Sequence, residues 1–152
     1  MTVAYVGLGA NLGKRERTLR TAIDRLAEDP EIEVLAVSRF RETAPVGFED
    51  QPAFINAAVQ LRTALTAREL LDRLLSVERM LGRTREGPRF GPRTVDLDLL
   101  LFGEAVIDEP GLTVPHPRLA ERVFALAPLA DLDPLLVVPG RGPVVALLTA
   151  LQ

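Results

Sequence analysis

The chain of 152 residues contains no cysteine, a single histidine and a single lysine, and only 5% of its residues are aromatic. Without cysteine, the chain can form neither disulfide bonds nor thiol intermediates. No apolar run approaches the roughly 18 residues of a membrane-spanning helix, and no signal peptide precedes the first predicted strand. These absences predict a cytoplasmic protein that does not bind a membrane.

The formal net charge is −3, so the overall electrostatic field does not favour nucleic-acid binding. Lys14 is the one lysine among 18 basic residues, and such a preference for arginine is typical of a high-GC genome or of a thermophile. With 47% hydrophobic and 26% charged residues, the chain has enough apolar surface to bury a core as one domain.

Hydrophobic periodicity predicts strands and helices that alternate along the chain. The expected strands are 3–8, 31–41, 54–61, 96–102 and 135–138, and the expected helices are 16–28, 67–81, 119–130 and 144–151, the third interrupted near Pro128. Thr66-Ala67-Arg68-Glu69 is a capping box that opens the second helix. Residues 7–13 are interpreted as a Gly-rich turn, because their spacing is one residue too long for a dinucleotide fingerprint. This order predicts an α+β sandwich with a largely antiparallel sheet.

Two acidic residues interrupt the otherwise apolar strand 96–102. Because side chains alternate along a strand, Asp96 and Asp98 are expected on one face with Leu100 and Phe102, and their Cα atoms about 6.5–7 Å apart. Two carboxylates on an apolar face repel each other and lose hydration. Such a pair suits a hard cation, and Mg²⁺ typically takes one or two carboxylates together with substrate phosphates.

Arginines, and no lysine, crowd the approach to this strand, at positions 79, 83, 85, 89 and 93. Guanidinium groups bind phosphate through two parallel hydrogen bonds. Carboxylates for a metal beside arginines for phosphate therefore point to phosphoryl transfer. The structural alternative is that both aspartates begin the strand at its exposed end and pair with these arginines.

Three further polar residues each allow a functional and a structural interpretation. Asn56 shares a strand face with Phe54, where it could hydrogen-bond a stacked heterocycle or satisfy a backbone group. Glu78 lies on or beside the apolar face of its helix, so it is either paired with an arginine or placed for a ligand. His116 stands between two prolines, which fix the backbone around it; a lone histidine is otherwise more often structural.

Residues 89–100, Arg-Phe-Gly-Pro-Arg-Thr-Val-Asp-Leu-Asp-Leu-Leu, closely resemble the signature of the 6-hydroxymethyl-7,8-dihydropterin pyrophosphokinases, a family of folate-pathway enzymes. The resemblance covers nearly the whole chain, through T-A-P-V-G…D-Q-P-x-F-x-N-A (43–57), E-R-x-L-G-R-x-R (78–85) and V-P-H-P-R (114–118). It implies a ferredoxin-like three-layer α-β-α sandwich and a single pyrophosphokinase domain over residues 1–152. It also implies transfer of the β,γ-diphosphate of ATP to the hydroxymethyl group of the dihydropterin, with release of AMP.

The resemblance also assigns roles by position. Catalytic roles are implied for Arg83, Arg93, Asp96 and Asp98, the two aspartates holding two Mg²⁺ ions. ATP contacts are implied for Glu78, Arg85, Arg89, His116 and Arg122. Pterin contacts are implied for Thr43, Val46, Phe54, Asn56 and Phe124, with the two phenylalanines on either side of the ring. The expected partners are ATP and 6-hydroxymethyl-7,8-dihydropterin, bound by a monomer.

Three positions depart from the family pattern. Leu75 replaces an expected glutamine, Gly111 an arginine found in some members, and Phe90 the commoner tryptophan. The first two changes remove polar contacts to ATP and therefore bear on affinity rather than on reaction type. Two other functions stay open at this point: another Mg²⁺-dependent phosphoryl or nucleotidyl transferase, and a small ferredoxin-like regulator that binds a ligand without turnover.

Overall fold

The computed structural model describes residues 1–10, 15–43, 54–81 and 95–152. Its elements are, in chain order, β1 (Thr2–Ala10), α1 (Arg15–Glu28), β2 (Ile32–Val37), β3 (Arg41–Thr43), β4 (Phe54–Thr63), α2 (Ala67–Leu81), β5 (Asp96–Phe102), β6 (Ile107–Glu109), β7 (Leu112–Val114), a 3₁₀ turn (Leu119–Glu121), α3 (Val123–Leu132), β8 (Val137–Val138), β9 (Gly142–Pro143) and α4 (Val144–Ala150).

The main sheet has the strand order β2-β4-β1-β5, and β3 pairs with β4 as well. All of its strand pairs are antiparallel, which confirms the predicted sheet. β1 lies between β4 and β5, so it separates the strand that carries Asn56 from the strand that carries Asp96 and Asp98. Within the described residues, β5 is an edge strand.

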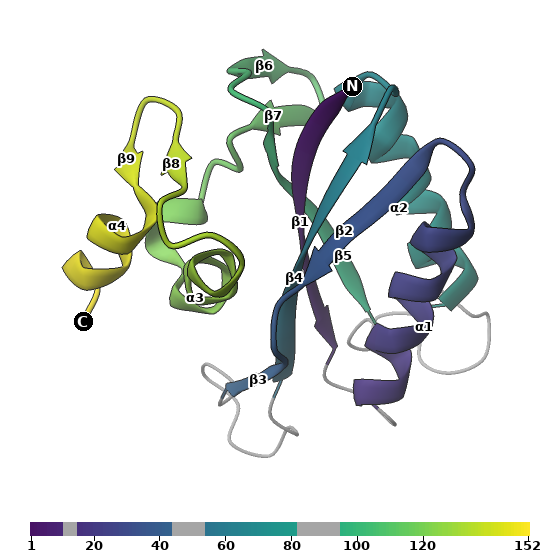
Figure 1. Cartoon of the computed structure of the whole chain (residues 1–152), viewed down its shortest axis with the longest axis horizontal. Coiled ribbons are helices and arrows are strands. Elements are labelled where there is room, and N and C mark those ends of the chain that lie inside the picture. The colour runs from purple at the N-terminus through teal and green to yellow at the C-terminus, as the bar shows by residue number, and fades with distance from the viewer. Residues whose placement is uncertain (11–14, 44–53, 82–94) are drawn as a thin grey trace.

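Helices cover both faces of this sheet, which confirms the three-layer arrangement. Figure 1 shows α1 and α2 on one side of the sheet and α3 and α4 on the other. The first core cluster joins one sheet face to the first two helices and includes Val6, Leu8, Leu19, Leu26, Val59, Leu61, Leu70, Leu74, Leu97 and Leu99. The second joins the opposite face to the C-terminal part and includes Tyr5, Ala58, Leu100, Leu101, Leu119, Leu126, Leu129, Val138 and Val144.

The start of α2 forms as its sequence predicts. The backbone N–H of Thr66 donates to Glu69 Oε1 (2.9 Å), and the backbone N–H of Glu69 donates to Thr66 Oγ1 (3.1 Å). These reciprocal bonds satisfy two donors that the first helical turn leaves open. Leu70, Leu74 and Glu78 follow at intervals of four residues and are all buried, so Glu78 lies on the face of α2 that packs in the interior, where it contacts β5.

The predicted strand 31–41 is divided into β2 and β3 by Ser38. The Ser38 N–H donates to the carbonyl of Ala58 (2.9 Å), while the Ser38 hydroxyl accepts from the N–H of Ala58 (2.8 Å). A side-chain oxygen thus replaces a backbone carbonyl in the ladder, which interrupts regular pairing. The prediction of one continuous strand was therefore wrong, although both pieces lie on the same side of β4.

Two predictions for the C-terminal third also need correction. No strand was expected between residues 102 and 135, but β6 pairs with β7 as an antiparallel hairpin. Pro128 was expected to interrupt its helix, yet α3 continues through it to Leu132. Proline removes one helical hydrogen bond, and burial of Leu126 and Leu129 in the second core cluster holds the helix in place despite that loss.

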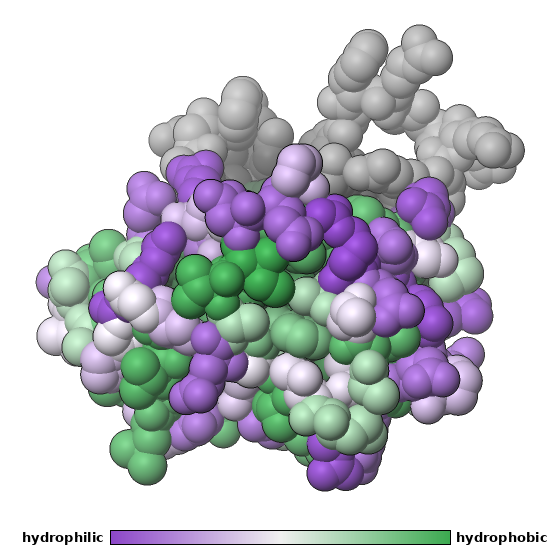
Figure 2. All heavy atoms as spheres, turned by 90° about the horizontal axis from the view of Figure 1, so that it is seen from above, coloured by the Kyte–Doolittle hydropathy of each residue, from purple (hydrophilic) through white to green (hydrophobic). Residues whose placement is uncertain are grey.

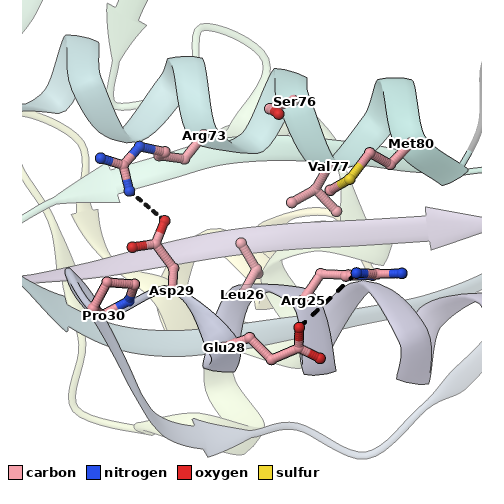
Figure 3. A pocket seen from close by; sticks show the side chains of 9 residues that line it. All are labelled: Arg25, Leu26, Glu28, Asp29, Pro30, Arg73, Ser76, Val77 and Met80. Carbon is pink, nitrogen blue, oxygen red and sulfur yellow. Dashed lines mark hydrogen bonds and ion pairs between the residues drawn. The ribbon is translucent and has the colours of Figure 1, made fainter.

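The outer surface differs between the two helical layers. Figure 2, the view from above, shows hydrophilic residues over much of the side formed by α1 and α2, and more apolar surface toward α4. A hollow of about 290 Å³ lies between α1 and α2. Among the side chains that line it, Arg73 pairs with Asp29 and Arg25 with Glu28 (Figure 3). No helix in the described ranges is long and apolar enough to cross a membrane.

Candidate functional site

Asp96 and Asp98 lie on the face of the sheet that is turned away from α1 and α2. The alternate residues of β5, Leu97 and Leu99, belong to the first core cluster. Both aspartates are partly exposed. In the register with β1, Asp96 lies opposite Gly9 and Asp98 opposite Gly7. The predicted shared face of the two carboxylates is therefore confirmed.

The prediction that Phe102 shares this face was wrong. The register between β1 and β5 shifts between Tyr5 and Val6, which leaves Leu100 as an extra residue on β5. A bulge of this kind reverses the alternation beyond it. Leu100 and Leu101 consequently both join the second core cluster, whereas Phe102 packs against the first.

Two glycines of β1 leave the sheet surface beside the aspartates without side chains. A Cβ atom at Gly9 would lie 2.9 Å from Asn56 Oδ1, and one at Gly7 would lie 3.2 Å from Leu100 Cδ1. Asn56 lies opposite Gly9 on the β4 side, so one row across the sheet reads Asn56, Gly9 and Asp96. The glycines were predicted to form a turn; they belong to β1 and form a glycine floor that the Leu100 and Asn56 side chains approach closely.

Glu78 reaches this edge of the sheet from α2. Its side chain is 4% exposed, and its Oε2 accepts a hydrogen bond from the backbone N–H of Leu97 at 2.7 Å. Leu97 lies between the two aspartates. The Glu78 carboxylate accepts the kind of backbone hydrogen bond that a neighbouring strand would otherwise accept from β5. Its predicted ATP contact stays a prediction, because the structure gives it this contact with the protein itself.

His116 is tied to β5 two residues beyond Asp98. Its backbone N–H donates to the carbonyl of Leu100 (3.0 Å), and its Nδ1 accepts from the backbone N–H of Arg118 (3.2 Å). Burial lowers the pKa of His116 below its ordinary value; the Asp98 carboxylate opposes this, and nearby arginines including Arg122 add to it. The structure thus brings His116 into the electrostatic range of Asp98.

Arg122 and Phe124 lie together at the start of α3. The guanidinium carbon of Arg122 is 5.4 Å from the centre of the Phe124 ring, within the range of a cation–π contact. Phe124 is 40% exposed. A partly exposed aromatic ring beside a cation is suited to contacts with ligand groups. The predicted ATP contact of Arg122 and the predicted pterin contact of Phe124 stay predictions.

The predicted pterin-side residues of β3 and β4 are also placed. Thr43 pairs with Phe54 in the register of β3 and β4, and Arg41 pairs with Asn56. Asn56 is 7% exposed, and Phe54 is partly exposed. On β4, Phe54 and Asn56 share the face of Ala58 by alternation, and Ala58 belongs to the second core cluster. The structure therefore places Phe54 and Asn56 on the same face as the aspartates.

An ion pair that the sequence did not indicate ties β3 to α3. Arg41 donates to Asp131 through Nε (3.0 Å) and Nη2 (2.8 Å), and Arg39 lies 3.5 Å from the same carboxylate. The hydrogen bonds from Arg41 hold the pKa of Asp131 below its ordinary value. The pair fixes the strand that enters the predicted pterin side, but its partners are far apart in the sequence.

Five predicted site residues lie outside the described residues: Arg83, Arg85, Arg89 and Arg93 of the basic segment, and Val46 of the segment before β4. Their roles stay predictions. Among the described residues, no group of three or more His, Asp or Glu side chains could hold a metal. Two carboxylates nevertheless suit Mg²⁺, whose remaining ligands are commonly water and phosphate oxygens.

The family model described as "7,8-dihydro-6-hydroxymethylpterin-pyrophosphokinase (HPPK)" matches residues 5–134. A 2-amino-4-hydroxy-6-hydroxymethyldihydropteridine pyrophosphokinase of Bacillus subtilis (strain 168) is 50% identical over 130 residues, which cover 86% of this chain and 77% of the relative. A protein of the same name from Pseudomonas aeruginosa is 45% identical over 135 residues, covering 89% and 83%.

Among solved structures, an HPPK-DHPS protein in complex with substrates matches with a TM-score of 0.78 and 13% identity, covering 98% of this chain and 43% of that one. Plasmodium falciparum HPPK-DHPS with pteroate matches with a TM-score of 0.77 and 13% identity, covering 98% and 44%. This chain thus spans less than half of those longer proteins, and the likeness to them concerns the fold.

The antiparallel α-β-α sandwich and these matches place the chain among the transferases, in the pyrophosphokinase class, with a ferredoxin-like fold. Within that class, the chain belongs to the 7,8-dihydro-6-hydroxymethylpterin-pyrophosphokinase family. The resemblance found in the sequence and the fold that it implied are both confirmed.

Proposed function

We propose that this chain transfers the β,γ-diphosphate of ATP to the hydroxymethyl group of 6-hydroxymethyl-7,8-dihydropterin, with release of AMP, in folate biosynthesis. Membership of the family supports the reaction. The observation that carries its location is the pair of partly exposed carboxylates, Asp96 and Asp98, facing the glycine floor of β1. The predicted cytoplasmic location, the monomeric state and the single domain belong to the same proposal.

Asp96 and Asp98 are the residues that would hold Mg²⁺, two ions in the proposal. When bound, the metal neutralises phosphate charge and orients the nucleotide. Two partly exposed carboxylates suit such a metal, and their strand pairs with β1 on one side and is bound by the Glu78 carboxylate through Leu97. The protein then contributes mainly positioning and charge stabilisation.

On the acceptor side, the row of Asn56, Gly9 and Asp96 suits a flat heterocycle with polar edges. The missing side chain at Gly9 lets the Asn56 amide lie over β1, and this buried amide would supply hydrogen-bonding groups at one end of the row. Phe54 and Phe124 are the aromatic residues that we propose for stacking against the ring faces.

On the nucleotide side, His116 and Arg122 lie where their charges interact with Asp98 or with each other. We assign them to the phosphate chain of ATP, together with Arg83, Arg85, Arg89 and Arg93. We also assign Glu78 to the nucleotide side, because its carboxylate binds the backbone of β5 between the two aspartates. The arginines would stabilise the negative charge that develops on the transferred group.

The test is to incubate the protein with ATP, Mg²⁺ and the hydroxymethyldihydropterin and to separate the nucleotides by chromatography. AMP that forms only when both Mg²⁺ and the pterin are present supports the proposal. ADP as the product would instead indicate transfer of a single phosphoryl group, and no turnover would leave a binding protein; either result would overturn the proposal.

The site assignment is tested with Asp98→Asn, which keeps the shape of the side chain and removes its charge. We expect turnover to fall on the order of 10²–10³-fold, the range for loss of one electrostatic catalytic group. Asp108→Asn, at an exposed position of β6, is the matched control and is expected to keep full activity. A folded Asp98→Asn variant with normal turnover would refute the assignment.

A further inference from the structure

A basic cluster surrounds the His116 imidazole, on which Asp98 also acts, and two segments contribute to it: residues 116–122 and the turn between β8 and β9. The segment of His116 is tied to β5 through the Leu100 carbonyl. Arg118 follows two residues later. Arg141, in the turn between β8 and β9, donates from Nη2 to the carbonyl of Pro117 at 3.2 Å. The C-terminal hairpin therefore carries a guanidinium group to the segment that holds His116.

The cluster has more positive than negative charge. The charges of Arg118, Arg122, Arg141 and Asp98 all act on the His116 imidazole. Arg118 has a distant carboxylate partner, Glu121 at 3.8 Å, and both side chains of that pair are largely exposed. Arg122 and Arg141 form no ion pair with a carboxylate of the described residues. Exposed guanidinium groups without a carboxylate partner are suited to binding an anion.

The alternative is a purely structural role, in which Arg141 only fixes the hairpin through its hydrogen bond to Pro117. That role needs one N–H donor and no charge. A guanidinium group has five N–H donors in a planar fork, and the structure records one protein acceptor for Arg141 within the described residues. The remaining donors have no recorded acceptor among the described residues, and the charge of Arg141 acts on the same imidazole as the charge of Asp98, near which the proposed function places phosphate groups.

We propose that Arg141 binds phosphate oxygens of the nucleotide, and thereby extends the anion-binding part of the site beyond His116 and Arg122. This inference rests on the proposed function, which makes a nucleoside polyphosphate the substrate. The ligand chemistry is that of a phosphate oxyanion, carried by the substrate ATP or by the released AMP. In this chain the C-terminal hairpin is then part of the nucleotide site.

The test compares four variants by calorimetric titration with α,β-methylene-ATP and Mg²⁺, an analogue whose α–β bond cannot be cleaved. Arg141→Ala is expected to raise the Kd about two- to fivefold, the range for an exposed charge pair. Arg141→Gln, which keeps a donor for Pro117 but no charge, should do the same, and Arg141→Lys should remain close to wild type. Arg62→Ala removes an exposed arginine of β4 that pairs with Glu33 and is the matched control, with an unchanged Kd.

Titrations with AMP and with inorganic pyrophosphate distinguish the two sources of phosphate. Loss of affinity for AMP and the ATP analogue assigns Arg141 to the α-phosphate, and loss for pyrophosphate and the analogue assigns it to the transferred group. The proposal is overturned if Arg141→Gln binds all three ligands like wild type, or if Arg62→Ala weakens binding equally. Because wild-type AMP formation is measured separately, failure of this inference is distinct from failure of the proposed function.

Discussion

The buried contact of Glu78 with β5 leads to a prediction about both stability and metal use. Glu78→Ala removes the acceptor of the Leu97 N–H, a bond of 2.7 Å at a buried position. A hydrogen bond to a charged group contributes about 1.5–3 kcal/mol, and a buried donor left without a partner costs about 1–3 kcal/mol more. We therefore expect Glu78→Ala to lower the free energy of unfolding by about 3 kcal/mol.

Glu78→Gln separates the hydrogen bond from the charge, because the amide oxygen can still accept from Leu97. Its expected loss is about 1 kcal/mol, the difference between a charge-assisted and a neutral hydrogen bond. Asp72→Ala, which removes an exposed acid from the same helix, is the control and should stay within about 0.5 kcal/mol of wild type. The assay is urea unfolding at pH 7, analysed with a common slope.

The same variants test whether Glu78 positions the metal-binding aspartates. Leu97 lies between Asp96 and Asp98, so a loosened β5 edge should raise the Mg²⁺ concentration needed for half-maximal AMP formation in Glu78→Ala, and much less in Glu78→Gln. Equal destabilisation by the two substitutions would refute the hydrogen-bond reasoning. A stable Glu78→Ala variant with unchanged Mg²⁺ dependence would refute the positioning role as well.

Three further predictions concern the pterin side. Arg41 holds the pKa of Asp131 low, so the stabilisation by this pair is complete above the unfolded-state value of about 3.9 and is lost as the pH falls through the folded-state pKa. Asp131→Asn should therefore be about 0.5–1 kcal/mol less stable than wild type at pH 7, and unfolding curves recorded at decreasing pH should converge; a constant difference would contradict this. Gly9→Ala should raise the Kd for the pterin about tenfold, because the new methyl group displaces the Asn56 amide, while equilibrium titration with the ATP analogue shows no change; unchanged pterin binding would mean that the floor is not used. Phe124→Ala should weaken pterin binding about fivefold, as expected for loss of one stacking contact, and an equal loss of ATP affinity would show that the ring assignment is wrong.

The face on which Asp96 and Asp98 lie could be predicted from sequence because it depends on local alternation. Leu97 and Leu99 between and after them are strongly apolar, and a strand that buries these residues must turn the aspartates the other way. Phe102 could not be predicted in the same manner. The bulge at Leu100 is set by pairing with β1, a strand whose residues lie more than 90 positions earlier in the chain.

The glycine floor was missed for a related reason. Gly7 and Gly9 lie in a sequence that also fits a turn, and glycine is common in turns. Their exclusion of larger residues comes from Leu100 and Asn56, which are contributed by other strands. The local signal was that Gly7 and Gly9 are two residues apart in an apolar segment, because this spacing in a strand places both glycines on the same face.

The row of β1 side chains explains how one sheet serves both packing and chemistry. Ala4, Val6 and Leu8 all point into the first core cluster, so this face holds α1 and α2 along the length of the strand. On the opposite face, Tyr5 packs in the second cluster, but Gly7 and Gly9 present no side chain. Packing therefore ends partway along this face, and the sheet surface that remains is bordered by polar groups. The first face stabilises the sheet independently of the second. The polar residues beside Gly7 and Gly9 can therefore serve charge and hydrogen bonding rather than core packing.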